Sequence, residues 1–132
     1  MSDTGDTGDG VTGHDPLGLG LRFKKEPPGL VARFEPGPGH RGPPGFLHGG
    51  IAATVLDETM ASLGWALDDV PCVTATLSVK YRRPVPLDGR PVRIEVWRER
   101  AEPRRTQRVN GRLLLADGTL AVEASGIFVQ KR

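Results

Sequence analysis

The sequence contains one long stretch with a helical pattern, and this stretch constrains the fold more than any other feature. Between Gly50 and Leu67, apolar side chains recur at the spacing of one helix face, with alanines between them. These apolar residues are Ile51, Val55, Leu56, Met60, Leu63 and Leu67. Pro71 then prevents the helix from continuing. We therefore expect a domain built around a single long helix.

Strand-like patterns lie on both sides of this helix. Two short alternating runs, 19–23 and 30–34, flank a Pro-Gly turn and predict a hairpin. Asp-Gly pairs at 88–89 and 117–118 are strong hairpin signals among the runs after the helix. Those later runs cover 72–81, 91–100, 105–115 and 119–129. Two strands, one helix and four strands predict an α+β domain in which an antiparallel sheet buries its apolar face against the helix.

Length and composition predict one domain and leave room for it to associate with copies of itself. The 132 residues suit a single core, and a hydrophobic fraction of 37% leaves part of the burial to oligomerisation. Residues 1–16 are mostly Gly, Asp and Thr, so we expect a disordered leader before a domain at 17–132. The sequence has no signal-peptide pattern and no bilayer-spanning apolar run, so we expect a cytoplasmic protein without a membrane partner.

The charge distribution favours an anionic small ligand. The formal net charge is +2, but residues 1–16 contain only acidic charges, so the remaining chain is more basic than the total indicates. No basic stretch is interleaved with aromatic residues, and we do not expect a nucleic-acid partner. The single cysteine, Cys72, cannot form an intrachain disulfide, and we expect a buried apolar side chain rather than a nucleophile.

Other charged residues are expected at the surface. We expect Glu58, Asp68 and Asp69 to be solvated charges of the helix surface or the helix end. A second group lies on or between the later strands and is expected to supply edge charges that discourage aggregation. This group is Arg98, Arg100, Arg104, Arg105 and Arg108.

The segment His48-Gly49-Gly50, at the start of the helix, is the first candidate for chemistry. It follows residues 36–45, in which prolines and glycines exclude regular structure, and a long connection of this kind is usually functional. Two glycines at a helix start leave backbone N–H groups uncovered at the positive end of the helix dipole. Such groups can hold an anion or an oxygen that becomes negative. Alternatively, the glycines only allow a tight approach and His48 caps the helix.

Asp57 is the second candidate. Its helical neighbours Ala53, Thr54, Met60 and Ala61 make a small, mostly apolar setting in which a carboxylate needs a partner or a function. Seven residues separate it from Gly50, which is roughly 10 Å along a helix. Amides and a carboxylate that far apart cannot both contact one carbonyl group at about 3 Å.

Two explanations of that separation remain. Either the helix-start amides or Asp57 is not involved in chemistry, or the site combines the amides of one subunit with Asp57 of another. A twofold dimer with antiparallel helices would bring the two together. The small side chains of Ala52, Ala53 and Ala61 would permit the close approach.

The segments GPPGFLHGGIAATVLDETM (42–60) and TATLSVKYRRPVP (74–86) resemble the PaaI-like hotdog-fold acyl-CoA thioesterase family. HGG followed by six residues and an Asp is much more specific than HGG alone, and the resemblance extends from about Asp15 to Phe128. It implies a hotdog fold, in which an antiparallel sheet wraps around one long central helix, assembled as a homodimer or homotetramer. It also implies hydrolysis of acyl-CoA thioesters with no metal and no cofactor, coenzyme A being part of the substrate.

The resemblance also implies roles for individual residues. The Gly49 amide, with Gly50 beside it, resembles the oxyanion donor. His48 resembles the residue that orients the loop and can assist at the carbonyl. Asp57 of the partner resembles the general base or nucleophile. Thr74 resembles a hydroxyl that positions water, although an ordinary strand residue fits equally well.

The same resemblance assigns the substrate-binding residues. Tyr81, Arg82 and Arg83 lie where relatives approach the phosphates of coenzyme A, although Arg82 and Arg83 also fit a solvated pair at a strand end. Phe46 and Leu47, within the motif, complete the predicted set. Some relatives carry an Asn six residues before the His, where this sequence has Gly42. We expect its contact with the substrate carbonyl to be either missing or supplied by another group, such as His40 or a backbone group.

Two other functions compete with thioester hydrolysis. A non-catalytic hotdog protein that binds acyl-CoA as a sensor or chaperone would need the same fold, but it would gain nothing from a carboxylate at Asp57. A hotdog hydratase fits less well because its Asp and His stand in a different order and spacing.

Overall fold

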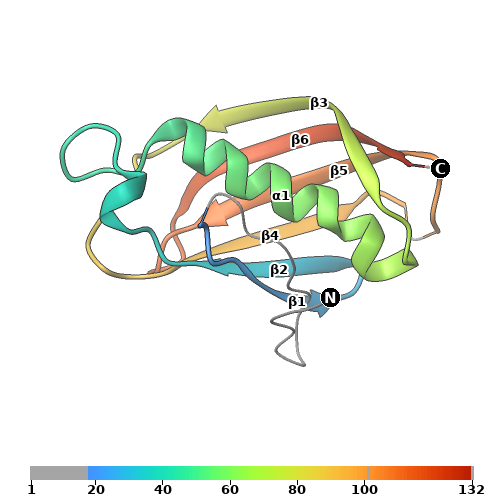
Figure 1. The fold of residues 1–132 in the computed structure, drawn as a ribbon, viewed down its shortest axis with the longest axis horizontal. Helices are drawn as coiled ribbons and strands as arrows, with labels where there is room; N and C mark the ends of the chain where they lie inside the picture. The colour runs from blue at the N-terminus through green and yellow to red at the C-terminus, as the bar shows by residue number, and fades with distance from the viewer. Residues whose placement is uncertain (1–17, 101, 132) are drawn as a thin grey trace.

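Across residues 18–100 and 102–131, which the computed structural model describes, the chain forms one six-stranded antiparallel sheet with one long helix against it (Figure 1). The predicted leader at 1–16 lies outside the described residues. The strands are β1 (Arg22–Glu26), β2 (Gly29–Phe34), β3 (Cys72–Tyr81), β4 (Val92–Arg98), β5 (Thr106–Leu114) and β6 (Leu120–Gln130). The helix is α1 (Gly49–Asp68), and η1 (Pro38–His40) is a short 3₁₀ turn. The predicted α+β arrangement is confirmed.

Helix α1 begins and ends at local signals in the sequence. His48 caps its start, because the Nδ1 atom of His48 accepts a hydrogen bond of 2.8 Å from the Gly50 N–H. At the other end Asp69 adopts a left-handed conformation with φ of 59°, and its N–H donates to the Trp65 carbonyl at 3.0 Å. The helix therefore spans the predicted stretch, with one more residue at each end.

The apolar face of α1 packs across the middle of the sheet. Leu56 and Met60 are almost completely buried, and both lie over Gly111 of β5. A Cβ atom at Gly111 would lie 3.2 Å from the Met60 Sδ and 3.3 Å from the Leu56 Cδ2. A glycine in the strand interior thus lets the helix approach the sheet closely.

Two details differ from the prediction: the bounds of the first strand and the connection at 88–89. The first strand covers Arg22–Glu26 rather than 19–23, and Pro27 and Pro28 form the turn to β2. The order β1-β2-β4-β5-β6-β3 separates β3 from β4, so the Asp-Gly pair at 88–89 does not join a hairpin. It lies in the connection that crosses from β3, at the edge of the sheet, to β4. The pair at 117–118 does join the neighbouring strands β5 and β6. An Asp-Gly turn sets the local reversal only, and the pairing partner depends on the rest of the sheet.

Strand β3 forms one edge of the sheet and contains an irregularity. Thr74 pairs with Phe128 and Thr76 with Ile127, so one residue of β3 is left over between them. This β-bulge places both Thr74 and Leu77 on the side of the sheet that faces α1. Gly126 of β6 accommodates it, since a Cβ there would lie 2.5 Å from the Thr76 carbonyl oxygen.

The expected surface positions of Asp68 and Arg98 are wrong. The two side chains form an ion pair in which they are only 9% and 6% exposed, with the Arg98 Nη2 donating to the Asp68 Oδ1 at 3.0 Å. Alternation along β4 places Arg98 on the same face as the buried Val96, beneath the last turn of α1. Gln107 completes the cluster by accepting from Arg98 at 3.1 Å.

Cys72 lies half-buried beside this cluster and packs against the core. Burial raises the pKa of its thiol above the ordinary value, and the negative charge of Asp68 adds to that effect. A thiol with a raised pKa forms less of the nucleophilic thiolate. This agrees with the expectation of an apolar side chain rather than a nucleophile.

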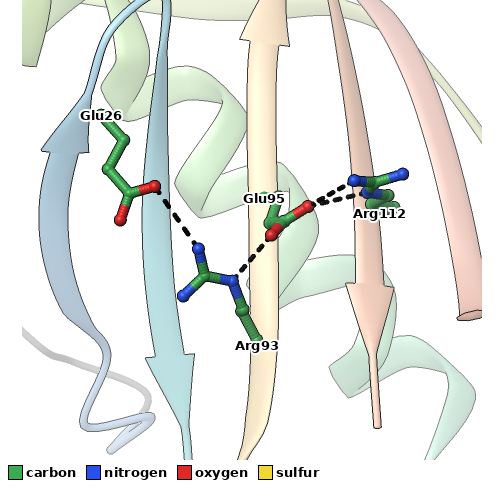
Figure 2. Close-up of polar contacts among 4 residues, drawn as sticks. All are labelled: Glu26, Arg93, Glu95 and Arg112. Carbon is green, nitrogen blue, oxygen red and sulfur yellow. Dashed lines mark hydrogen bonds and ion pairs between the residues drawn. The ribbon is translucent and has the colours of Figure 1, made fainter. Parts of the chain in front are cut away.

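On the opposite face of the sheet, charged side chains form a network across the strands. Figure 2 shows Glu95 of β4 between Arg93 and Arg112, with Arg93 also reaching Glu26 of β1. Arg112 also lies over the ring of Trp97, 5.5 Å from its centre. No helix within the described residues is long and apolar enough to cross a membrane.

Candidate active site

The loop before α1 folds back tightly on itself and delivers His48 to the helix start. The His48 N–H donates to the His40 carbonyl at 2.8 Å, and the Leu47 N–H donates to the Val85 carbonyl at 2.9 Å. A Cβ atom at Gly42 would lie 2.8 Å from the His48 Cα. In this arrangement the loop therefore has no room for a side chain at Gly42. The His40 ring is held within the loop, with its Nδ1 accepting from the Gly37 N–H at 3.1 Å.

The two glycine amides at the helix start are not equivalent. The Gly50 N–H is engaged by the His48 Nδ1, and a Cβ at Gly50 would lie 2.9 Å from the His48 Cε1. Gly50 thus serves the cap, and in this arrangement its amide is not available to an oxyanion. The Gly49 N–H has no hydrogen-bond acceptor among the described residues. Of the two predicted donors, Gly49 alone is uncommitted.

Tyr81, at the end of β3, lies directly against this helix start. Its hydroxyl donates a hydrogen bond of 2.6 Å to the Gly49 carbonyl oxygen. The ring approaches closely enough that a Cβ at Gly49 would be in ordinary contact with it, at 3.6 Å. Sequence reasoning placed Tyr81 near the substrate but missed this contact, because no local pattern links two residues 32 positions apart.

Asp57 and Thr74 form a second cluster, further along the helix. The Thr74 hydroxyl donates to the Asp57 Oδ1 at 2.7 Å, and the β-bulge aims Thr74 at the helix. Asp57 is half-buried on the flank of α1 that faces β3. Ala53 and Ala61 are half-exposed, but Ala52 is buried against the core rather than available to a partner. The alanine face predicted for close approach is therefore narrower than expected.

The two clusters remain apart within one chain. Helix α1 is continuous from Gly49 to Asp68, so eight residues, or about 12 Å, separate Gly49 from Asp57. The structure thus brings His48, Gly49, Gly50 and Tyr81 together at the helix start. It places Asp57 with Thr74 two turns away.

A hollow of about 300 Å³ adjoins the helix start. Gly49, Tyr81, Arg82 and Arg83 contribute to its wall. The other lining residues are Leu47, Ala52, Pro84, Val85 and Val122. Arg82 pairs with Glu123, whereas Arg83 has no carboxylate partner among the described residues. Phe46, which is 38% exposed, lies outside this lining on the loop. Among the described residues, no three His, Cys, Asp or Glu side chains are grouped as a metal site requires.

An antiparallel sheet around one central helix, with a glycine-rich helix start and an aspartate midway, defines a hotdog domain. The profile of the family described as Thioesterase superfamily matches residues 44–122. The chain belongs to the thioesterase superfamily.

Curated relatives carry the same domain within longer proteins. The acyl-coenzyme A thioesterase THEM4 of Xenopus laevis is 37% identical over 101 residues, which are 76% of this chain and 45% of that protein. THEM4 of Mus musculus is 29% identical over 125 residues, covering 86% of this chain and 50% of that protein. The chain thus spans about half the length of these relatives.

Solved structures show the same fold. AziG of S. sahachiroi superposes with a TM-score of 0.76 at 20% identity, covering 86% of this chain and 93% of that one. The protein BH2602 from Bacillus halodurans, whose structure was determined with CoA, gives a TM-score of 0.73 at 23% identity. That likeness covers 86% of this chain and 76% of that one. The hotdog fold implied by the sequence resemblance is confirmed.

Proposed function

We propose that the protein hydrolyses an acyl-CoA thioester at a site shared between two subunits. The observation that carries this proposal is the uncommitted Gly49 amide at the start of α1, about 12 Å along the same helix from the Asp57–Thr74 pair. The helix start supplies an amide donor, and the Asp57–Thr74 pair supplies a carboxylate and a hydroxyl group. The reaction needs both. The names of the curated relatives support the substrate class.

The Gly49 N–H can stabilise charge on the thioester oxygen. As the carbonyl carbon is attacked, negative charge develops on that oxygen, and a donor at the positive end of a helix stabilises it. The preceding His48 holds the adjacent Gly50 amide, so the peptide is oriented before the substrate arrives. Such preorganised donors typically contribute roughly 10²–10³-fold to kcat.

The Asp57 carboxylate of the partner subunit supplies the attack. Either it bonds to the carbonyl carbon, expels the coenzyme A thiolate and leaves a mixed anhydride that water then hydrolyses, or it removes a proton from a water that attacks the carbonyl carbon as the C–S bond breaks and the thiolate leaves. Thr74 donates its hydroxyl hydrogen to one Asp57 oxygen, so the second oxygen is free to face the substrate. The Thr74 oxygen retains lone pairs that can accept from a water.

The exposed edge at β3 supports the self-association that this site needs. An unpaired edge strand offers backbone N–H and C=O groups to another chain. Among the described residues, four large apolar side chains are exposed, two of them on β3, as an association surface requires. They are Phe46, Trp65, Val73 and Tyr81. Antiparallel pairing of β3 with the β3 of a partner, about a twofold axis, would set the two α1 helices antiparallel. A homodimer is thus the smallest assembly that completes the site, and a homotetramer would contain two such pairs.

The hollow beside Gly49 is a suitable place for part of coenzyme A. Arg82 and Arg83 line it, and arginine suits the recognition of phosphates. BH2602, which has the same fold, was solved with CoA, and this supports the assignment. Our proposal assigns coenzyme A to the substrate and needs no metal or other cofactor. The predicted cytoplasmic location stays a prediction.

Replacing Gly49 by proline tests the oxyanion role directly. Gly49 is the first residue of the helix, a position where proline is well tolerated and where it deletes the N–H. His48 already has the extended conformation, φ −62° and ψ 132°, that a residue before proline prefers. We expect Gly49→Pro to lower kcat by roughly 10²-fold or more. Gly49→Ala, which keeps the N–H and fits against Tyr81, should retain most activity in the same acyl-CoA assay.

Asp57→Asn tests the other cluster and separates hydrolysis from mere binding. If the protein is an acyl-CoA sensor or chaperone, the wild type binds acyl-CoA but releases no free thiol from any acyl group. Hydrolysis at Asp57 instead predicts thiol release by the wild type and its loss in Asp57→Asn, with binding retained by calorimetry. Full activity in Asp57→Asn contradicts our proposal.

A further inference from the structure

We propose that Tyr81 is a positioning residue of the oxyanion site, and that it acts by fixing the Gly49–Gly50 peptide and, through it, the tautomer of His48. This inference rests on the proposed hydrolysis for its kinetic consequences. Its structural consequences can be measured without a substrate.

Tyr81 and His48 hold opposite ends of a single peptide group. The Tyr81 hydroxyl donates to the Gly49 carbonyl oxygen at 2.6 Å, and the Gly50 N–H donates to the His48 Nδ1 at 2.8 Å. That carbonyl and that N–H belong to the same planar unit. Two hydrogen bonds at its two ends therefore prevent rotation of the plane. A chain of hydrogen bonds through one peptide also polarises each bond in turn, so that each strengthens the other.

The helix start needs such restraint. The first N–H groups of a helix have no acceptor within the helix, and glycine has more conformational freedom than any other residue. Two successive glycines therefore form a helix start that would fray if it were held only from within. The uncommitted Gly49 N–H adjoins the peptide that Tyr81 holds. A rotation of that peptide would redirect the Gly49 amide away from the substrate oxygen.

The same contacts determine which nitrogen of His48 carries the hydrogen. A ring nitrogen that accepts a hydrogen bond has no hydrogen of its own, so in neutral His48 the hydrogen is on Nε2. The opposite tautomer would set the Nδ1–H against the Gly50 N–H, two donors facing each other. His48 thus presents an N–H donor on the side of the ring away from Gly50. Tyr81 reinforces this choice because it strengthens the Gly50 donor.

The hydroxyl, rather than the ring, carries this role. Tyr81 is 54% exposed, and its ring lies 3.6 Å from the position that a Cβ atom at Gly49 would occupy. Phenylalanine would keep the ring and remove only the hydrogen bond. Tyr81→Phe is therefore the informative change, and it leaves the folding of the domain largely untouched.

Kinetics of Tyr81→Phe test the positioning role. We expect kcat to fall roughly three- to ten-fold, as the loss of one hydrogen bond implies, with little change in KM. Ser125→Ala, which deletes a hydroxyl from β6 away from the site, should leave both constants unchanged. An unchanged kcat, or an effect confined to KM, would overturn the proposal. A wild type that hydrolyses no acyl-CoA would instead refute the proposed function, and the next measurement would still decide the role of Tyr81.

NMR spectroscopy tests the structural part without substrate. Long-range ¹H–¹⁵N correlations distinguish the two histidine tautomers, and the signals of His48 are identified by their loss in His48→Gln. We expect the Nε2–H form in the wild type. In Tyr81→Phe we expect a mixture of tautomers and faster hydrogen exchange at the Gly50 amide. His40, whose Nδ1 accepts from Gly37, is an internal control that should not change. A His48 in the Nδ1–H form, or signals unaffected by Tyr81→Phe, would overturn the inference.

Discussion

At the scale of single residues, the contact between Thr74 and Asp57 shows how the backbone aims a side chain. Simple alternation along β3 would put Thr74 and Leu77 on opposite faces of the sheet, since they are three positions apart. The bulge between Thr74 and Thr76 shifts the alternation by one residue, so that Thr74 and Leu77 both face α1. Bulges of this kind often adjoin functional sites, where they redirect a side chain. The hydroxyl of Thr74 thereby reaches the carboxylate that the proposed reaction uses.

Thr74→Val, which keeps the shape of the side chain and removes its hydroxyl, should lower kcat several-fold. The hydrogen bond that orients Asp57 is lost, and a several-fold decrease in kcat corresponds to about 1 kcal/mol of activation free energy. Because Thr74 is exposed, the free energy of unfolding should change by less than about 0.5 kcal/mol. Steady-state kinetics and urea denaturation measure the two quantities. Thr74→Ser keeps the hydroxyl and is the control. Equal losses in both variants would argue against the orienting role.

At the scale of secondary-structure elements, the end of α1 is tied to the sheet by a buried ion pair. Asp68 and Arg98 come from the helix and from β4, and both are almost fully removed from solvent. Breaking such a pair by changing one partner leaves a buried charge without compensation. The pair therefore determines how firmly the last turn of the helix stays on the sheet.

Asp68→Asn should lower the free energy of unfolding by about 3 kcal/mol, because it leaves the Arg98 charge buried. Urea denaturation followed by circular dichroism measures this. Asp69→Asn is the matched control, since Asp69 is exposed and its left-handed conformation suits asparagine. That control should stay within about 0.5 kcal/mol of the wild type. Similar losses in both variants would mean that the ion pair contributes little.

The charged network on the outer face of the sheet links strands rather than helix and sheet. Hydrogen bonds from Arg93, and then from Arg112, hold the pKa of Glu95 below its ordinary value (Figure 2). A carboxyl group with a lowered pKa in the folded state stabilises the fold above its unfolded-state pKa. That stabilisation is lost as the pH falls through the folded-state pKa.

Glu95→Gln should therefore cost about 1 kcal/mol of unfolding free energy at pH 7, since Glu95 is 21% exposed but its arginine partners are about half exposed. The difference from the wild type should begin to shrink as the pH falls below about 4.3, the pKa of an unperturbed glutamate, and should vanish only below the lowered folded-state pKa, where the carboxyl is protonated in both states. Denaturation curves at several pH values test both statements. A pH-independent difference would indicate lost packing rather than lost charge.

At the scale of the whole molecule, the proposed function makes assembly part of the chemistry, because the two clusters are separated within one chain. A rigid helix keeps Gly49 and Asp57 two turns apart, and no loop movement can bring them together. Under the proposed function, each substrate carbonyl needs Gly49 from one subunit and Asp57 from another. Two sites therefore form together in a twofold dimer.

Subunit complementation tests this arrangement. A heterodimer of Gly49→Pro and Asp57→Asn, purified with two different tags, contains one intact site and one site with both defects. It should recover about half of the wild-type activity, although each variant alone is nearly inactive. Sedimentation measures the assembly state of each sample. A heterodimer as inactive as its parents would show that the site does not combine subunits.

Local patterns in the sequence determined the span of α1, most strand runs, the glycine-rich helix start and the distance to Asp57. These features depend on residues close together in the chain, whose periodicity and turn-forming residues can be recognised without knowing the fold. Longer-range features were decided only by the tertiary structure. Arg98 became buried because the sheet and helix enclose it, and the Asp-Gly turn at 88–89 led to a crossover because β4 pairs elsewhere.

The helix start also combines a feature that local sequence determined with features that only the tertiary structure decided. The sequence alone predicted that amides are exposed there, because two glycines follow His48. Only the tertiary structure showed that the His48 ring turns toward the Gly50 amide and leaves the Gly49 amide uncommitted. It also showed that Tyr81, 32 residues away, holds the other end of the Gly49–Gly50 peptide. Contacts between distant residues arise from packing the whole sheet around the helix, and no local pattern of side chains contains them.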